Sequence, residues 1–278
     1  MNNNIFDKYP FPHPYDVKKK IEQGMRLPFD LHDELDHIFS TQKLKKKYKV
    51  LIVGCGHNEA IYHSLRNPKF KFTAIDISSS VIDSNLKQIE DYNIKNLKIH
   101  NIDILDFNDN QFDIIITMDF ISYHENPVQV LKHISSLLSD NGVILANVLS
   151  SSYFQQVNII RDVLLNLGYS YESDEDINEA FDFVKKLDNL HPSRIALLDF
   201  VKGQADPNSF IDIRDFTIRF LNHSVHYYSV NELFELFKLS NVFFQGWYSN
   251  SLYYPSANIK QNFIPPLVKR LKSKSLQE

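Results

Sequence analysis

The chain contains one short segment in which an aliphatic run stops at two glycines one residue apart. The run Val50 to Val53 is typical of a buried parallel strand. Gly54 and Gly56 allow the backbone to turn tightly and to lie against a ligand. Cys55 lies between these glycines, and Asn58 follows two residues later. The segment therefore predicts a strand that ends in a ligand-binding turn.

An acidic residue follows this turn at an informative distance. A second strand is predicted from Phe70 to Ile77, and Asp76 lies at its end. Nucleotide-binding α/β folds place an acid about 20 residues after the glycine turn, where it binds ribose hydroxyls. We therefore expect an α/β domain that binds an adenosine-containing cofactor.

The residue at position 59 bears on which cofactor this is. A dinucleotide fingerprint needs a third glycine there, because a helix N-terminus must approach the pyrophosphate closely. The chain has Glu59, whose carboxylate would repel two phosphates. S-adenosylmethionine carries a sulfonium and an ammonium group and no phosphate, so a carboxylate nearby is harmless or helpful. Asn58 also fits, because asparagine tolerates a left-handed backbone. NAD, and a glycine turn without any ligand, remain alternatives.

The α/β rhythm continues beyond this region. Further strands are predicted at Leu97–Asp103, Phe112–Met118 and Val143–Val148, and a helix is predicted at Val128–Leu138, ended by the turn Asp140-Asn141-Gly142. Ligands of open α/β sheets bind outside the carboxyl ends of the strands. Polar residues such as Asp103, Asp119 and Asn147 fall at those ends.

Residues 48–148 resemble the class I S-adenosylmethionine-dependent methyltransferases. The segment Val50 to Asn58 is similar to the family's first motif, and Asp76 matches the acid that binds ribose. Asp103, with Ile104 beside it, matches the acid that reads the adenine amino group. The resemblance implies these cofactor-binding residues: Gly54, Cys55, Gly56, Asn58, Asp76, Ile77, Asp103, Ile104, Met118 and Asp119.

The segments on either side of this core complete the predicted organisation. We expect an N-terminal cap over residues 1–40, a core over 41–149 and 227–257, a mostly helical insertion serving as a substrate lid over 150–226, and a basic tail over 258–278. The insertion contains predicted helices at Gln155–Leu167 and Asp176–Leu190 and an apolar segment, Arg194–Phe200, that is a helix or a short strand.

The last part of the core is predicted as a helix followed by two strands. Ser229 and Glu232 form a capping box at the start of the helix, and strands follow at Val242–Tyr248 and Leu252–Tyr254. The family resemblance then implies a Rossmann-like, mostly parallel sheet of seven strands with one antiparallel. The stretch Asp215–Tyr228 is similar to bacterial methyltransferases often fused to tetratricopeptide repeats.

Composition narrows the classes of partner. The chain has 278 residues, 43% hydrophobic and 23% charged, with a formal net charge of -4. This balance favours an ordinary globular protein over a nucleic-acid binder. A single cysteine rules out an internal disulfide and suits the cytoplasm, and no signal peptide or membrane-spanning run is recognisable. We expect neither a nucleic acid nor a membrane as partner.

Methyl transfer requires alignment of donor and acceptor, and a base where the acceptor must lose a proton. His124 is the candidate base, because it follows the fourth strand on the cofactor side. Tyr123, His223 and Tyr227 are candidate substrate-binding residues. In the resemblance, Tyr123 replaces the first of two histidines often found there. Histidine spacing predicts no metal site.

The sequence thus predicts an S-adenosylmethionine-dependent methyltransferase that acts on oxygen or nitrogen of a small molecule. One alternative is a methyltransferase of peptide or protein side chains. Another is a non-catalytic binding or regulatory subunit that keeps the fold. An NAD(P)-dependent oxidoreductase is disfavoured by Glu59.

Overall fold

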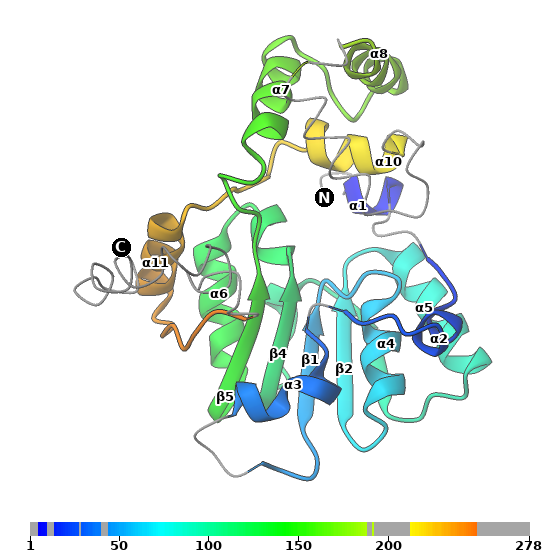
Figure 1. The fold of residues 1–278 in the computed structure, drawn as a ribbon, viewed down its shortest axis with the longest axis vertical. Coiled ribbons are helices and arrows are strands. Elements are labelled where there is room, and N and C mark those ends of the chain that lie inside the picture. The colour runs from blue at the N-terminus through cyan, green and yellow to red at the C-terminus, as the bar shows by residue number, and fades with distance from the viewer. Residues whose placement is uncertain are drawn as a thin grey trace, which may run out of the picture.

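The computed structural model describes residues 5–9, 14–27, 29–39, 44–187, 191 and 212–248. Its centre is a parallel sheet of five strands in the order β3-β2-β1-β4-β5 (Figure 1). The strands are β1 Lys49–Val53, β2 Lys71–Asp76, β3 Leu97–Asn101, β4 Phe112–Met118 and β5 Leu138–Asn147. The chain order reverses between β1 and β4. A nucleotide site is expected at the carboxyl edge beside this reversal.

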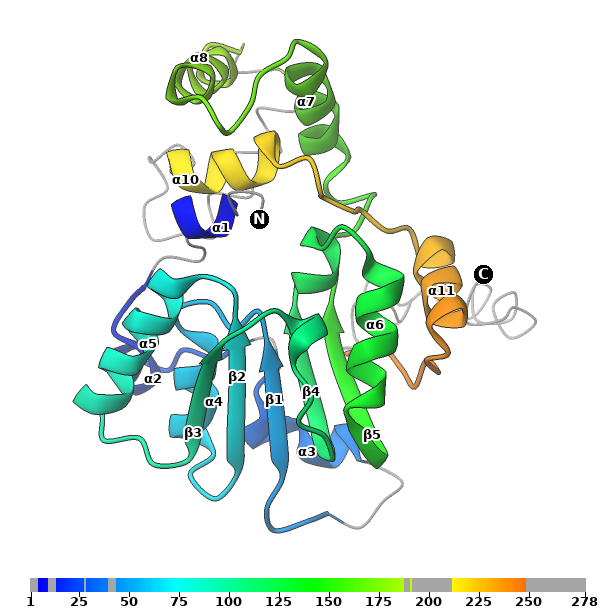
Figure 2. The same ribbon diagram turned by 180° about the vertical axis from the view of Figure 1, so that it is seen from behind.

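Helices cover both faces of the sheet because side chains alternate along β1. Val50 and Ile52 pack with the core that contains helices α2, α3, α4 and α5, whereas Leu51 and Val53 pack with α6 and η1 (Figures 1 and 2). These elements are α2 Val17–Glu22, α3 Leu31–Ile38, α4 Glu59–Arg66, α5 Ser79–Asp91, η1 Ile104–Asp106, η2 Phe120–Tyr123 and α6 Pro127–Ser136.

A second group of helices lies beyond the carboxyl ends of the strands (Figures 1 and 2). We call it the distal helices: α1 Ile5–Lys8, α7 Gln155–Asn166, α8 Asp174–Lys185, α10 Ile213–Phe216 and the π-helical η3 Thr217–Leu221. Helices α7, α8, α10 and η3 share an apolar core that includes Val157, Leu164, Ile177 and Phe216. None of the helices in the described ranges combines the length and the apolar character needed to cross a membrane.

Both predicted helices of this region are found. Helix α7 ends one residue before the expected Leu167. Helix α8 begins at Asp174, two residues earlier than expected, because the Ser173 side chain accepts a hydrogen bond from the backbone N–H of Asp176 and caps the helix. The apolar segment Arg194–Phe200 lies outside the described residues.

A neck of two segments outside the helices and the sheet, residues 148–152 and 225–229, joins the distal helices to the sheet. The backbone N–H of Tyr228 donates to the Leu149 carbonyl at 2.8 Å, and the N–H of Ser151 donates to the Tyr228 carbonyl at 2.9 Å. Ser122 accepts from both segments: its Oγ binds the Leu149 N–H at 2.9 Å and its carbonyl binds the His226 N–H at 2.7 Å. The second segment leads into α11, Val230–Ser240, through the predicted Ser229–Glu232 capping box.

The seven-stranded expectation is not confirmed, since the described residues form five strands, all parallel. Val242–Tyr248 was predicted as a strand and is not one. Two of its aromatic rings pack on α11 instead: the ring centroids of Phe244 and Trp247 lie 5.1 and 6.4 Å from that of Phe234. Leu252–Tyr254, expected as the antiparallel neighbour, lies outside the described residues.

Strand β5 begins five residues earlier than predicted. Leu138 pairs with Phe112, but the next pairing joins Val143 to Ile114, so residues 139–142 form a bulge. The turn signal at Asp140-Asn141-Gly142 is therefore used inside the strand. A side chain at Gly142 would place its Cβ 2.7 Å from the Phe112 carbonyl oxygen.

We predict that Gly142→Ala lowers the free energy of unfolding by about 1–3 kcal/mol, because the added methyl group overlaps rigid backbone. Urea titration followed by circular dichroism measures this change. Gly246→Ala is the matched control, since nothing lies within 4 Å of a Cβ at that position. Equal stability of the two variants would contradict the bulge.

Candidate functional site

The glycine turn after β1 has the geometry that two glycines permit. Gly54 and Gly56 have φ angles of +64° and +51°, in the left-handed region. The backbone N–H groups of Gly54 and Cys55 both donate to the Ile75 carbonyl, at 3.0 and 3.2 Å. A Cβ at Gly54 would lie 2.5 Å from the Phe120 ring. The turn is therefore packed closely between β2 and η2, the short helix that follows β4.

The Asp76 carboxylate connects this turn to the next one. Its Oδ2 accepts a hydrogen bond from the Gly56 N–H at 3.1 Å, and its Oδ1 accepts from the Ser78 N–H at 2.9 Å. Burial raises the pKa of Asp76, although both hydrogen bonds act in the opposite direction. The acid expected to bind ribose thus also shapes the turn beside it.

Two side chains of α5 hold the turn from its carbonyl side. Asn85 Nδ2 donates to the Gly56 carbonyl at 2.7 Å, and Gln88 Nε2 donates to the His57 carbonyl at 3.0 Å. Sequence analysis missed both residues. A signal existed, because Asn85 lies on the same helical face as the buried Val81 and is itself fully buried.

Asn58 differs from expectation. Its φ angle is -130°, so it does not adopt the left-handed backbone that we predicted, and the two glycines supply that conformation. Its Oδ1 accepts a hydrogen bond from the Tyr15 N–H at 3.2 Å. The side chain therefore anchors the N-terminal segment beside the turn.

Two further carboxylates lie near this edge. Burial, and then the charge of Asp119, raise the pKa of Glu59 to about 8, and its side chain is 13% exposed. Burial also raises the pKa of Asp119, while the charge of Arg219 lowers it. Asp119 has a φ angle of +55°, and its Oδ1 accepts from Asn147 Nδ2 at 2.8 Å. Arg219, from the distal helices, is a third residue that sequence analysis missed.

The residues predicted to bind adenine lie just after the carboxyl ends of β2 and β3. Asp103 accepts from the Leu105 N–H at 2.8 Å and caps η1, and Ile104 is buried beneath it. Ile77 is an apolar side chain that stays 37% exposed beside Asp76. Met118 ends β4 and is half-buried. These residues share the carboxyl edge of the sheet with the glycine turn.

His124 has a structural partner. Its Nδ1 accepts a hydrogen bond from the Asn126 N–H at 3.1 Å, so the neutral ring carries its proton on Nε2. Burial lowers its pKa, against the opposing charges of Asp103 and Glu125. The lone pair of Nδ1 is thus occupied at the start of α6.

The three candidate substrate residues lie in three different places. Tyr123 is in η2, where the Phe6 ring of α1 packs edge-on at 5.7 Å. Tyr227 is in the neck, and burial raises the pKa of both phenols. His223 lies closer to α7, because its carbonyl accepts from Arg161 Nη2 at 3.1 Å and its ring packs near Tyr171 at 6.1 Å.

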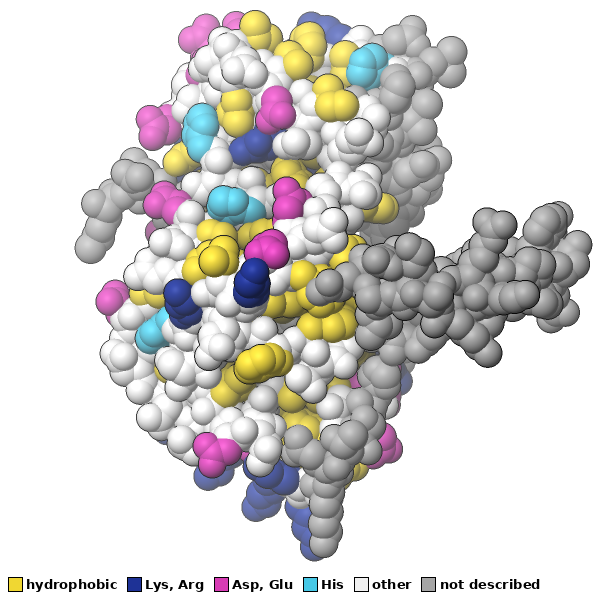
Figure 3. Space-filling view, turned by 90° about the vertical axis from the view of Figure 1, so that its left-hand side faces the viewer, with side chains coloured by type: hydrophobic (Ala, Val, Ile, Leu, Met, Phe, Trp, Pro, Cys, Tyr) yellow, Lys and Arg dark blue, Asp and Glu magenta, His cyan; other side chains and the backbone are white. Residues whose placement is uncertain are grey.

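The distribution of charge fits a cationic ligand better than a pyrophosphate. Burial raises the pKa of the Cys55 thiol, and the charges of Asp76 and Glu59 raise it further. The basic run Lys45–Lys49 lies at the opposite end of β1, where Lys45 and Lys49 pair with Asp113 and Asp109. Figure 3 shows Lys and Arg side chains gathered at that lower end. Within the described ranges, no group of three His, Cys, Asp or Glu side chains could hold a metal ion.

The chain is similar to known proteins in sequence and in fold. Residues 51–144 match the family model described as Methyltransferase domain. Two curated relatives are from Rickettsia prowazekii: Uncharacterized protein RP028, 25% identical over 164 residues, and Uncharacterized protein RP789, 28% identical over 166 residues. Each alignment covers 56% of this chain, and 66% and 30% of the respective relatives.

Among solved structures, PKMT2 from Rickettsia typhi has a TM-score of 0.66 at 19% identity, over 95% of this chain and 50% of PKMT2. PKMT2 in complex with AdoHcy has a TM-score of 0.58 at 18% identity, over 83% and 44%. At this identity the likeness concerns the fold, and the chain spans about half the length of PKMT2. Residues 51–144 therefore match a methyltransferase domain, and their parallel sheet and glycine turn have the form that such a domain requires.

Proposed function

We propose that this protein transfers a methyl group from S-adenosylmethionine to oxygen or nitrogen of a small molecule. The observation that carries the proposal is the glycine turn held to Asp76 at the carboxyl edge, with Glu59 and Asp119 nearby. AdoHcy, the demethylated cofactor, is bound in a PKMT2 structure of the same fold.

The residues divide into roles around the ligand. Asp76 would bind the ribose hydroxyls, Asp103 the adenine amino group, and Ile77 the flat adenine face. Glu59 and Asp119 would lie toward the cationic methionine end. When bound, S-adenosylmethionine supplies a methyl group made electrophilic by its sulfonium. The chain's own contribution is alignment of the acceptor and exclusion of water.

The distal helices lie over this edge as a roof (Figures 1 and 2), which favours a small acceptor. The α1 helix is attached to α5 by Ser79, whose backbone N–H donates to Asp7 Oδ1 at 3.1 Å, and to α8 by Lys8, whose Nζ lies 2.8 Å from Asp174 Oδ1. Phe6 packs on Tyr123 beneath this bridge. A peptide or protein acceptor would need this roof to be open, and a non-catalytic subunit would bind the cofactor without turnover.

We predict that Asp76→Ala weakens S-adenosylmethionine binding about 10- to 100-fold, because charge-assisted hydrogen bonds contribute about 1.5–3 kcal/mol. Calorimetric titration of the purified protein with S-adenosylmethionine, S-adenosylhomocysteine and NAD measures this. Asp91→Ala, at the exposed end of α5, should bind normally. Binding of NAD alone, or unchanged affinity in Asp76→Ala, would contradict the site.

Glu59 predicts a pH-dependent affinity. With a pKa of about 8, Glu59 is mostly protonated at pH 7 in the free protein, and a cationic ligand favours its ionised form. Affinity for S-adenosylmethionine should therefore rise from pH 6 to about pH 8, and binding at pH 7 should release a proton. The measurement is calorimetry in buffers of different ionisation enthalpy. Glu59→Gln should abolish the release, whereas the exposed Glu90→Gln should not.

The same group affects stability with a defined sign. The pKa of Glu59 is higher in the folded than in the unfolded protein, so its stabilising contribution is complete below about pH 4.5 and is lost as the pH rises through about 8. Glu59→Gln should reduce this part of the pH dependence of the melting temperature. An unchanged profile would mean that Glu59 is ionised in the native protein.

His124→Asn should retain methyl transfer to an acceptor found by screening, because an amide oxygen can replace Nδ1 as partner of the Asn126 N–H. His124→Leu should lower the free energy of unfolding by about 1 kcal/mol, since that N–H loses its partner. Turnover assays and urea titration of both variants test this. Loss of turnover in His124→Asn with normal cofactor affinity would instead assign His124 as the base.

A further inference from the structure

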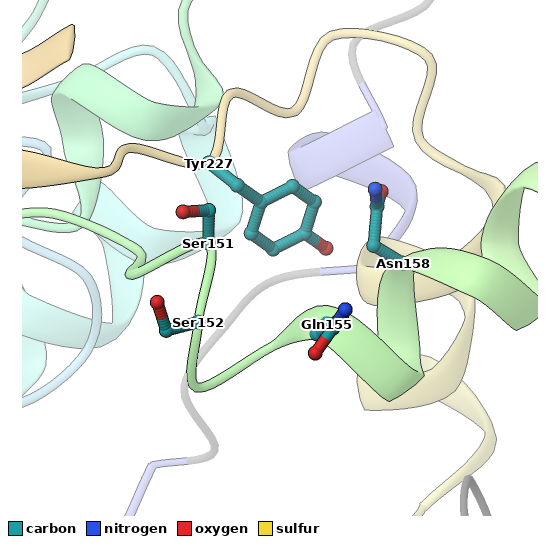
Figure 4. Close-up of a pocket in the computed structure, with 5 residues that line it drawn as sticks. All are labelled: Ser151, Ser152, Gln155, Asn158 and Tyr227. Atoms are coloured by element: carbon teal, nitrogen blue, oxygen red, sulfur yellow. The ribbon is translucent and has the colours of Figure 1, made fainter.

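The neck contains a cavity of about 360 Å³ that sequence analysis touched only through Tyr227. It is lined by Ser151, Ser152, Gln155, Asn158 and Tyr227 (Figure 4). The serines come from the segment after β5, the two amides from the first turns of α7, and the tyrosine from the returning segment. Residues more than 65 positions apart in the chain thus form one binding surface.

The five lining side chains are all uncharged, and all can form hydrogen bonds. Across the part of the chain that the structure describes, none of them is hydrogen-bonded to another protein group. Ser151, Asn158 and Tyr227 are half-buried, whereas Ser152 and Gln155 are exposed at the rim. Partly buried polar atoms normally have partners, so these atoms are available to a ligand or to water.

Charged ligands are disfavoured by the surroundings. Arg161, a basic residue of α7, points its guanidinium elsewhere: its Nη2 donates to the carbonyls of Asn222 and His223 at 3.0 and 3.1 Å. Its Nη1 pairs with Asp162 at 3.2 Å. The cavity lining therefore offers no cation to a phosphate or carboxylate and no carboxylate to an ammonium group. Burial raises the pKa of Tyr227, so its hydroxyl remains a donor.

The chain segment that carries Tyr227 is hydrogen-bonded to the predicted reaction edge. Tyr227 follows His226, whose N–H is bound by the Ser122 carbonyl, and Ser122 adjoins Tyr123. The charge of Arg219 acts on both Tyr123 and Tyr227. A group held in the cavity is therefore part of a molecule that can extend toward the cofactor edge.

We propose that this cavity binds a carboxamide group of the methyl acceptor, remote from the atom that is methylated. A carboxamide presents a strong acceptor beside strong donors. Gln155 and Asn158 are three residues apart on one face of α7. The side-chain amide of each offers an NH2 donor and a carbonyl acceptor, which match the acceptor and donors of a carboxamide. Serine and tyrosine hydroxyls complete the set, since each can donate or accept. The inference rests on the proposed methyl-transfer function and specifies the acceptor's class.

Saturation-transfer NMR with the full chain tests the proposal. The probe is N-acetylglycine N-methylamide, a neutral molecule with two amide groups, and methyl glucoside and acetate serve as hydroxyl and charged comparisons. We expect signal transfer to the amide that falls at least threefold in Gln155→Leu/Asn158→Leu. Asn166→Leu, at the exposed end of α7, should keep the wild-type signal.

No transfer to the amide, an unchanged signal in the double variant, or a stronger signal for the glucoside would overturn the proposal. Circular dichroism verifies folding, and Tyr227→Phe replaces the double variant should that variant fail to fold. Calorimetry with S-adenosylmethionine on the same samples separates the two claims. Absent cofactor binding with a retained amide signal would remove the methyl-transfer function and leave the cavity as an amide site.

Discussion

The double hydrogen bond of the Asp76 carboxylate is the interaction on which the cofactor edge depends. One oxygen holds the turn after β1 and the other holds the turn after β2, so two loops of separate strands share one anchor. Asn85 and Gln88 bind the carbonyls of the first turn from α5. Because both its N–H and C=O groups are held, the turn is preorganised and a ligand need not order it.

The two ends of the sheet carry charged groups of opposite sign. Carboxylates with raised pKa values surround the glycine turn, whereas the lysine run Lys45–Lys49 lies where the strands begin and is paired with acids there. Such an edge distinguishes ligands by their charge. A cationic ligand lowers the free-energy cost of ionising the buried acids, whereas a pyrophosphate raises that cost. The same argument explains why Glu59 is tolerated where a dinucleotide fold needs glycine.

Sequence predicted what depends on local pattern. Aliphatic runs gave four of the five strands nearly in place, and the spacing of Gly54, Gly56 and Asp76 gave the geometry of the edge. The bulge in β5 was not predictable, because strand register is decided by the partner strand. The Val242–Tyr248 strand was wrong because aromatic residues suit a sheet and a helix-packed cluster equally well. Gln88 and Arg219 acquire their positions only from tertiary packing, whereas the helical spacing of Asn85 from Val81 was a signal that the prediction did not use.

The two acceptors of Ser122 give the neck a mechanical property. Its side chain binds the chain leaving the sheet, and its carbonyl binds the chain returning to it. Ser122 itself follows Asp119 by three residues, and its N–H donates to the Asp119 carbonyl at 2.9 Å. Both connections between the sheet and the distal helices therefore share one anchor, and that anchor is itself hydrogen-bonded to the turn that carries Asp119.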